Sequence, residues 1–322
     1  MEIYSRIMDE FAAILHVKEW QEMQALFHRV ASNRPSHWLL PVKVCEAVGG
    51  DQENVIPAVL AVACSHIGII LVDDMLDEDP RGEHIKIGEG TAANMASALQ
   101  SAALTAITNS KLGSEAKLLA MESVNEMFLA TTIGQHWDVN SIVTDEDLYW
   151  KIASAKSSPF FGAAFQIGAV AGGATVELSL QIKELGRLYG EMIQLHDDVN
   201  DTLAVPASPD WDEGRSPLTI LFAQLVDHPL RHRFKELRPQ VRSNSQALEE
   251  AQDILIHSGA VSYCLYQLLK RYDFVKGILS TLTLEKPDVL ADIFEHVVRP
   301  VFSLFQEVDD PMIAAALQGN RE

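Results

Sequence analysis

Hydrophobic positions recur along most of this chain with the spacing of an α-helix. Ile3, Ile7, Phe11 and Leu15 are four residues apart, so they lie on one face of a helix. The chain contains no sustained alternation of polar and apolar residues bounded by hairpin turns, which would be the pattern of a half-buried strand. We therefore predict an all-α protein.

Polar stretches that contain proline or glycine divide the predicted helices. Asn33 to Ser36 ends the first helical region, Gly49-Gly50 ends the second, and the stretches 80–90 and 204–217 are expected to be loops. Thr144-Asp145-Glu146-Asp147 is typical of a helix N-terminus. The predicted helical regions are 1–32 (as one or two helices), 38–48, 55–79, 91–109, 114–142, 145–171, 176–203, 218–225 and 249–318, with loose or short helical structure over 228–248.

Two of these regions are apolar over nearly the length of a membrane span, which requires about twenty apolar residues. The segment 55–72 contains Pro57 and His66 and leads directly into two aspartates, and the segment 160–176 contains four glycines. Neither segment has a basic cluster on one side. We interpret both as helices buried on every side in the centre of the fold, and we expect no stable membrane insertion.

The chain length and composition favour one large helical domain. The 322 residues would allow two domains, but no linker separates two cores, so we predict a single domain over 1–322. With 48% hydrophobic residues, the chain can form a full core.

The charge and the cysteine content restrict the partners and the compartment. The formal net charge of −20 argues against nucleic acid or an anionic membrane surface as a partner. It leaves an anionic small substrate possible, because bound Mg²⁺ reverses the local charge. The three widely spaced cysteines favour a reducing cytoplasm, and residues 1–10 lack the apolar region of a secretory signal.

Two aspartate clusters with the pattern D-D-x-x-D each follow an apolar helical run. The first consists of Asp73, Asp74 and Asp77, and the second of Asp197, Asp198 and Asp201. Residues i and i+4 share a helix face, so each cluster directs two carboxylates the same way. Unpaired carboxylates repel one another, whereas Mg²⁺ is bound by carboxylate oxygens together with water and phosphate oxygens. The repeated pattern therefore indicates two acidic helices that face one another and bind Mg²⁺.

Further motifs, in the same order and spacing, resemble the trans-isoprenyl diphosphate synthases of the polyprenyl synthetase family. The resemblance extends from about Arg34 to Ala223. The matching positions are Gln194 with the second aspartate cluster, Gly134-Gln135-His136-Trp137-Asp138, Tyr149 with Lys156 seven residues later, His66 seven residues before Asp73, and Gly214 to Thr219, where Arg215 replaces a lysine. The fold that this implies is a single helical bundle of the isoprenoid synthase type with a central active-site cavity.

The resemblance also implies a role for each matching residue. The family ionises an allylic prenyl diphosphate with Mg²⁺, usually three ions. Asp73, Asp77 and Asp197 would then bind the metal ions. The other members of the set would orient these ligands, contact the diphosphate or stabilise the allylic cation: Asp74, Asp198 and Asp201 as orienting groups, Lys156 and Arg215 at the diphosphate, and Gln135 and Gln194 beside the cation.

Simpler explanations exist for the individual residues. An acidic helix end is commonly a solvated surface, and Lys156 alone could be a surface lysine. His66 on an apolar helix is more often a hydrogen-bonded core histidine than a ligand. Gln135 could be a satisfied core amide, and Asp138 could bond only to backbone. The joint spacing of the motifs favours the functional interpretation.

The binding site for isopentenyl diphosphate, the usual acceptor, differs from the family pattern. Pro35 and His37 replace arginines, so Arg34, His66 and Arg81 remain as its candidate residues. Three interpretations follow. The protein condenses an allylic diphosphate with isopentenyl diphosphate to a longer trans-polyprenyl diphosphate; it transfers the prenyl group to another acceptor or cyclises it; or it is a non-catalytic regulatory subunit. Intact aspartates in both clusters argue against the third.

Two further expectations come from the resemblance. In the family, a bulky aromatic residue four or five positions before the first aspartate limits chain growth. Gly68 and Ile69 hold these positions here, so we expect products of fifteen to twenty carbons or more. We also expect a homodimer that associates through apolar helices such as 91–109.

Overall fold

The computed structural model describes residues 2–211 and 216–306, together with the side chains up to residue 301. All regular elements in these residues are helical, as the sequence predicts. They are the α-helices α1 (Ile3–Ala13), α2 (Gln21–Ser32), α3 (Leu40–Ala47), α4 (Gln52–Leu76), α5 (His84–Ile87), α6 (Glu89–Thr108), α7 (Ser114–Asn140), α8 (Glu146–Lys156), α9 (Ser158–Ala171), α10 (Val176–Leu203), α11 (Leu218–Leu225), α12 (Arg231–Leu237), α13 (Ser245–His257), α14 (Ala260–Leu279) and α15 (Pro287–Gln306), and the 3₁₀ turns η1 (Val17–Glu19), η2 (Ser36–Leu39), η3 (Pro209–Trp211) and η4 (Arg238–Gln240).

The two long apolar segments form the central helices α4 and α9. Helix α9 packs against α3, α4, α7 and α10. Helix α4 is long and apolar enough to cross a membrane by length and composition, but 72% of its most apolar window is buried inside the protein itself. Close packing at the centre requires a residue without a side chain, because a Cβ on Gly186 of α10 would lie 2.5 Å from the carbonyl oxygen of Phe161. Both segments are central core helices, as the sequence predicts.

One predicted helix is divided in two. The sequence predicts a single helix over 145–171, whereas α8 ends at Lys156 and α9 begins at Ser158. Pro159 stands in the first turn of α9. Proline has no N–H to donate to the preceding turn and its ring clashes with that turn, so the helix breaks there. The predicted N-terminus is correct, since the carboxylate of Asp145 accepts a hydrogen bond of 2.9 Å from the Leu148 N–H.

Smaller differences occur near the loops and the C-terminus. The expected loop 80–90 contains the short helix α5, and the expected helical region 249–318 is interrupted between α14 and α15. Residues 307–318 of that prediction lie outside the described residues. Gly88, at the end of α5, has φ +84°, which a glycine adopts without strain.

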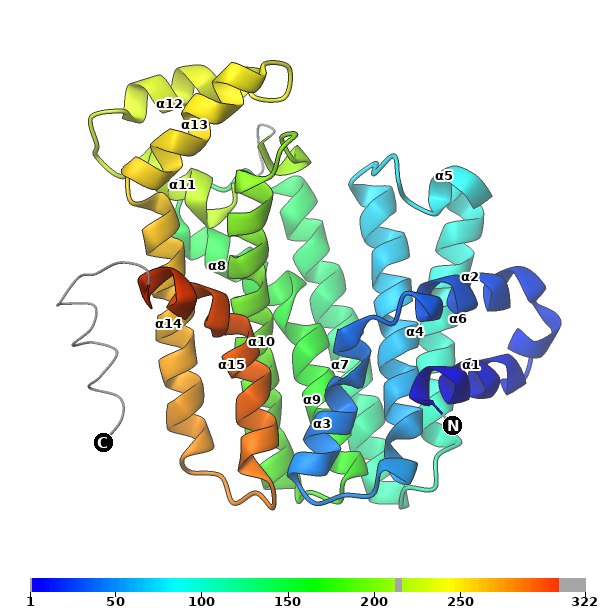
Figure 1. Cartoon of the computed structure of the whole chain (residues 1–322). Helices are drawn as coiled ribbons and strands as arrows, with labels where there is room; N and C mark the ends of the chain where they lie inside the picture. The colour runs from blue at the N-terminus through cyan, green and yellow to red at the C-terminus, as the bar shows by residue number, and fades with distance from the viewer. Residues whose placement is uncertain (1, 212–215, 307–322) are drawn as a thin grey trace.

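Helices α11, α12 and α13 form a second, smaller group of buried residues beside the main core (Figure 1). The main core includes most of the other helices, and α11 contributes to both. Whether the whole chain is one domain stays a prediction.

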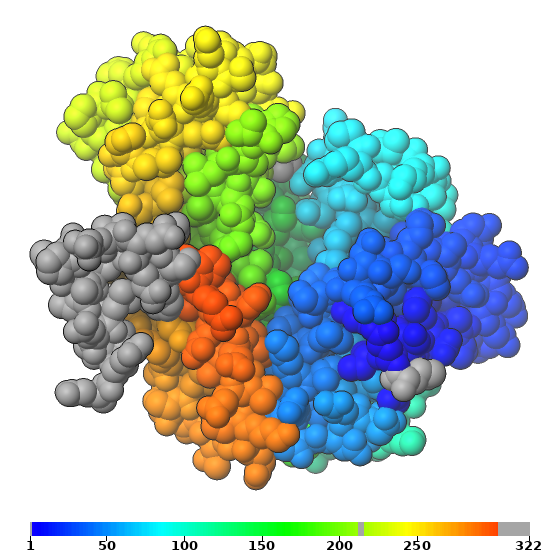
Figure 2. All heavy atoms as spheres, viewed as in Figure 1, coloured from blue at the N-terminus to red at the C-terminus, as the bar shows by residue number. Residues whose placement is uncertain are grey.

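The ends of α4 and α10 that carry the aspartate clusters lie at the same end of the bundle (Figure 1). Figure 2 shows that the surface is hollowed between these two helix ends, coloured cyan and green. The fold therefore brings the two clusters to a common cleft, as their pattern predicts.

Candidate active site

Asp73, the first aspartate of the first cluster, is held by α7 and α8. The Gln135 amide donates a hydrogen bond of 3.0 Å to Asp73 Oδ1. Lys156 Nζ lies 3.1 Å from the same oxygen and 2.7 Å from Asp138 Oδ2. Gln135, Asp138 and Lys156 thus join Asp73 in one hydrogen-bonded group on three helices. Asp138 thus bonds to a side chain and Lys156 is not a free surface lysine, whereas Gln135 is a buried amide with a hydrogen-bond partner, as its simpler explanation also describes.

The local charges keep Lys156 protonated. Burial acts to lower its pKa, but Asp73, Asp138 and the more distant Asp77 outweigh burial, so the pKa is raised above its usual value. A permanently charged ammonium lies beside the first cluster as a result. Such a group attracts an anionic ligand to the cleft.

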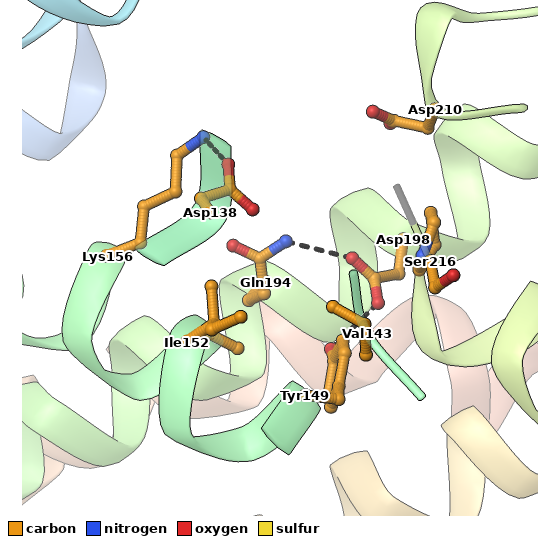
Figure 3. A pocket seen from close by; sticks show the side chains of 11 residues that line it. Asp138, Val143, Tyr149, Ile152, Lys156, Gln194, Asp198, Asp210 and Ser216 are labelled. Atoms are coloured by element: carbon orange, nitrogen blue, oxygen red, sulfur yellow. Dashed lines mark hydrogen bonds and ion pairs between the residues drawn. The ribbon is translucent and has the colours of Figure 1, made fainter. Parts of the chain in front are cut away.

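Asp198, the middle aspartate of the second cluster, is buried with 4% of its surface exposed. Its carboxylate accepts hydrogen bonds from the Tyr149 hydroxyl (2.7 Å) and the Gln194 amide (2.8 Å) (Figure 3). It also accepts one from the Leu218 N–H (2.7 Å). Burial raises the pKa of Asp198, and the three donors act against this shift. Asp198 therefore joins α10 to α8 and α11, and its carboxylate is already bound by three protein donors.

Asp197, in contrast, is exposed. Partial desolvation in the cleft, together with the carboxylates of Asp201, Asp198 and Asp210, raises its pKa to about 7. Asp201 is close enough to Arg81 of the loop after α4 to contribute to the pKa of that guanidinium. The strong mutual repulsion at Asp197 is what a cation would relieve.

A cavity of about 100 Å³ lies beside Asp198 of the second cluster and extends to Lys156, the partner of Asp73. Lys156 and Asp138 lie on one of its sides, and Gln194 and Asp198 on the other (Figure 3). Asp210, a residue that the sequence analysis did not single out, also lines it. Gln194 accepts a hydrogen bond of 2.8 Å from the Ser157 hydroxyl at the α8–α9 break, which orients its amide.

Asp74 faces the loop that follows the first cluster. Burial and the neighbouring Asp79 and Asp73 raise its pKa, while His84 and Arg81 act in the opposite direction. Arg81 is bound to Asp79 by hydrogen bonds of 3.1 and 2.8 Å, and 84% of its side chain is exposed. Arg81 is thus held at the rim of the loop, away from the cavity described above.

The candidate acceptor residues are separated in the structure. Arg34 is paired with Glu2 at 2.8 Å, and 63% of its side chain is exposed. The ring of His66 lies against His37, with 4.2 Å between the ring centroids, and Phe160 packs on both. Burial lowers the pKa of His37 to about 4 and that of His66 to about 3. Both imidazoles are therefore neutral at pH 7.

The structure places two of the three remaining candidate residues. Gly68 faces α6, where an added Cβ would meet the Ala96 carbonyl oxygen and Leu99 Cβ at 3.5 Å. Ile69 is partly buried against the main core. Arg215 lies outside the described residues.

The sequence analysis used Tyr149 only as a spacing marker and missed the contribution of α14. Tyr149 and Lys156 are seven residues apart, which is two helical turns, so the spacing already places both on the same face of α8. On α14, Arg271 donates to Glu191 at 2.7 Å and stacks on the Trp150 ring at 3.6 Å. Tyr263 donates to Glu146 at 2.7 Å. No local sequence signal indicates these contacts between distant segments.

The donor set fits a hard divalent cation. Among the described residues, no three His, Cys, Asp or Glu side chains converge closely enough to hold a metal ion by themselves. Mg²⁺ commonly takes only one or two protein carboxylates and completes its octahedron with water and phosphate oxygens. Asp73, Asp77 and Asp197 carry the carboxylate oxygens that would hold such an ion if one were bound.

Comparisons with known proteins agree with this geometry. The family described as polyprenyl synthetase matches residues 21–255. The chain is 31% identical to a geranylgeranyl diphosphate synthase of Methanosarcina mazei over 197 residues, which are 56% of this chain and 60% of that relative. It is 27% identical to a short chain isoprenyl diphosphate synthase of Methanothermobacter thermautotrophicus over 264 residues, which are 77% of this chain and 79% of the relative.

Solved structures show the same fold. The geranylgeranyl pyrophosphate synthetase of Pyrococcus horikoshii superposes with a TM-score of 0.78 at 20% identity, covering 92% of this chain and 98% of that one. A polyprenyl synthase of Caulobacter crescentus, solved with calcium and isoprenyl diphosphate, superposes with a TM-score of 0.76 at 21% identity and covers 92% and 93% of the two chains.

Proposed function

The chain belongs to the polyprenyl synthetase family of trans-prenyltransferases, and from this premise we propose that it ionises an allylic prenyl diphosphate and condenses it with isopentenyl diphosphate. The observation that carries the proposal is the group of Asp73, Gln135, Asp138 and Lys156 beside the cleft. It places a protonated lysine and an oriented carboxylate where a diphosphate would lie between the two clusters.

The residues of the cleft act on charge that develops when the diphosphate leaves. Asp73, Asp77 and Asp197 would hold Mg²⁺, which supplies Lewis-acid stabilisation of the leaving diphosphate when it is bound. Lys156 adds a fixed positive charge on the same side. Preorganised groups of this kind typically contribute about 10²–10³-fold in rate.

The same cleft must protect an allylic cation from water. Ile152 and Ala153 of α8 line the cavity next to Lys156. The Gln194 amide is held by Ser157 and Asp198, so its dipole is fixed near the reacting carbon and adds no strong nucleophile. An apolar wall with few, fixed dipoles favours prenyl transfer over hydrolysis.

The proposal is tested by incubation with labelled farnesyl diphosphate, Mg²⁺ and isopentenyl diphosphate. We expect a longer trans-polyprenyl diphosphate, and no product when EDTA replaces Mg²⁺. Lack of turnover of geranyl and farnesyl diphosphate under all these conditions would refute the proposal and favour a regulatory subunit.

A second candidate function, prenyl transfer to another acceptor or cyclisation, is favoured by the acceptor residues. Arg34 and Arg81 are engaged in ion pairs with Glu2 and Asp79. His37 and His66 are neutral at pH 7, so they offer no fixed charge to a second diphosphate. Product formation from farnesyl diphosphate and Mg²⁺ without isopentenyl diphosphate would establish this candidate.

We propose products of fifteen to twenty carbons or more. Relatives with 31% and 24% identity are named geranylgeranyl and geranylfarnesyl diphosphate synthase, and Gly68 and Ile69 carry no aromatic ring. Gly68 faces α6, so a phenylalanine there would press α4 and α6 apart rather than simply narrow a tunnel. Product length in Ile69→Phe, analysed by reversed-phase chromatography, is therefore the cleaner test of a length limit at this level.

We also propose a homodimer, for which the outer face of α7 offers support. Leu118 and Leu129 on this face are 58% and 68% exposed. Exposed apolar side chains that lie together mark interaction surfaces. Light scattering after gel filtration should give twice the 35.6 kDa mass of the chain.

A further inference from the structure

A second cavity, separate from the cleft, lies on the side of α7 and α8 that faces α10. Its volume is about 310 Å³. Residues of α7, α8, α9 and α10 line it, and we call it the α7–α10 groove. No part of the proposed chemistry uses it.

The rim of the groove is basic in an otherwise strongly acidic protein. Lys151, Lys183 and Arg187 line it together with a single acid, Glu126. Lys183 pairs with Glu126 at 2.6 Å, whereas Arg187 lies 3.7 Å from Glu184 outside the lining. The lining therefore carries a positive charge in a chain with a formal net charge of −20. A local positive potential on such a background attracts anions to one place.

The interior of the groove is largely apolar. Met127, Ala130 and Pro159 form its inner wall, and Trp137 closes one side with the Lys151 ammonium 4.3 Å above its ring. Two serines also line it: the Ser154 hydroxyl donates to Glu191 at 3.0 Å, whereas Ser123 is 3% exposed and its hydroxyl has no hydrogen-bond partner among the described residues. A buried hydroxyl without a partner is costly, and a ligand oxygen that reaches it would remove this cost.

We propose that the α7–α10 groove binds a short apolar chain that ends in a phosphate. The anion would bind at Lys183 and Arg187, and the chain would lie on Met127 and Trp137. A volume of about 310 Å³ is at the lower end of the about 300–1,000 Å³ range of ligand pockets, which suits a chain of one or two isoprene units. The choice of a prenyl chain rests on the proposed function, but the recognition rests on the groove itself.

The groove lies directly behind the residues of the cleft. Trp137 precedes Asp138, and Ser154 and Ala155 precede Lys156. Helices α7 and α8 are in tight contact there, because a Cβ on Gly134 would lie 2.4 Å from the Ala155 carbonyl carbon. A ligand that displaces this pair of helices would shift Asp138 and Lys156 together. We therefore expect a ligand in the groove to change the rate of product formation in the cleft.

The experiment measures binding of geranyl monophosphate by calorimetry in EDTA. Without metal, the carboxylates of the two aspartate clusters outnumber the Lys156 ammonium, so they disfavour a phosphate in the cleft. We expect one molecule per chain, with binding at least about tenfold weaker in the double variant Lys183→Gln/Arg187→Gln. Lys276→Gln, which removes an exposed lysine on α14, should bind like the unmodified protein. Equal binding by the double variant, or absence of binding to the unmodified protein, would overturn the proposal.

Two further arms locate the ligand and identify its chemistry. Binding should change the tryptophan fluorescence of the unmodified protein but not that of Trp137→Phe. A change of the same size in Trp137→Phe would place the ligand elsewhere and contradict the proposal. Geraniol and inorganic phosphate should each bind at least about tenfold more weakly than geranyl monophosphate. If the protein bound vesicles that contain phosphatidic acid but did not bind geranyl monophosphate, its partner would be a membrane surface. That result would also refute the proposal.

The outcome is independent of the synthase assay. Binding in EDTA needs no turnover, so the groove can be confirmed in a protein that makes no product and refuted in one that does. If the protein both binds this ligand and makes product, geranyl monophosphate added to the Mg²⁺ assay should alter the rate of product formation by the unmodified protein. It should not alter the rate of Lys183→Gln/Arg187→Gln, whose substituted residues lie outside the cleft.

Discussion

Asp74 and Asp198 hold the same middle position in two identical motifs, yet their surroundings differ. Asp74 is half-buried beside the polar stretch that follows α4, and neighbouring Asp79 and Asp73 add repulsion. Asp198 is buried and is satisfied by Tyr149, Gln194 and Leu218. The first motif ends its helix next to a loop, whereas α11 and α8 cover the second.

The comparison shows that an identical motif does not imply identical roles. A carboxylate that accepts three hydrogen bonds holds helices together, and one that faces other carboxylates is available for a cation. The second motif thus combines a residue of the cleft, Asp197, with an adjacent residue of the core, Asp198. The predictions below test this division.

The largest effect is expected on turnover in Asp73→Ala and Asp197→Ala. Each variant loses a proposed metal ligand, so the rate of product formation should fall about 10²–10³-fold. Asp197→Ala should leave the fold as stable or slightly more stable because repulsion is relieved, but Asp73→Ala also removes the partner of Gln135 and Lys156. Asp253→Ala, at an exposed position on α13, is the control. A rate within threefold of the unmodified protein in either variant would contradict the metal assignment.

The next largest effect is expected on stability in Asp198→Ala compared with Asp74→Ala. Removing Asp198 leaves the Tyr149 hydroxyl, the Gln194 amide and the Leu218 N–H without their partner. Each unsatisfied donor costs about 1–3 kcal/mol, so the free energy of unfolding should fall by about 3 kcal/mol or more. Asp74→Ala should change it by less than about 1 kcal/mol. Urea unfolding followed by circular dichroism measures both, and equal losses would show that the two positions are equivalent after all.

A smaller effect on stability is expected in Tyr149→Phe. The variant removes one donor of the three at Asp198 and keeps the ring, so the loss should be about 1.5 kcal/mol, as for a hydrogen bond to a charged group. In a double-mutant cycle with Asp198→Ala, the Tyr149→Phe change should cost little once Asp198 is absent. Fully additive losses would mean that the hydroxyl does not act through Asp198.

The smallest effect concerns the pH dependence of stability at Asp197. Desolvation and neighbouring carboxylates raise the pKa of Asp197 from 3.8 to about 7, so between these values the folded protein retains a proton that the unfolded chain has released. The stability that this group contributes is fully present below about pH 4 and is lost as the pH rises through about 7. Asp197→Asn cannot ionise, so in EDTA it should equal the unmodified protein at about pH 4 and exceed it at about pH 8. The gain should be modest because the side chain is exposed.

A constant difference between Asp197→Asn and the unmodified protein across this pH range would show that Asp197 does not titrate as described. Asp253→Asn provides the exposed control, in which no pH-dependent difference is expected.

Much of the fold was predictable because its helix ends carry local signals. The predicted bounds 176–203 match α10, whose Thr175 side chain caps the first turn by accepting from the Leu178 N–H. Pro159 carried the signal for the break between α8 and α9 that our single predicted helix ignored. The motif pattern and the resemblance singled out Gln135, Asp138 and Lys156, but they did not indicate that these residues contact Asp73.

The remainder depended on packing that spacing does not encode. Helix α4 is apolar on every side, so its pattern does not reveal its rotation, and the orientation of Gly68 toward α6 could not be derived. The buried position of Asp198 depends on Leu218, which is distant in sequence. Likewise, the contact of His37 with His66 arises only when α4 and the turn before α3 meet.

Helix α14 places a practical limit on how far this protein can be shortened. All candidate residues of the cleft precede Ala223, and the family match stops at residue 255, so a chain that ends there retains every recognised motif. Such a fragment would lack Arg271, which contacts Trp150 and Glu191. It would also lack Tyr263, which donates a hydrogen bond to Glu146. The helix that carries Lys156 would lose its support, so a useful fragment extends at least through Leu279.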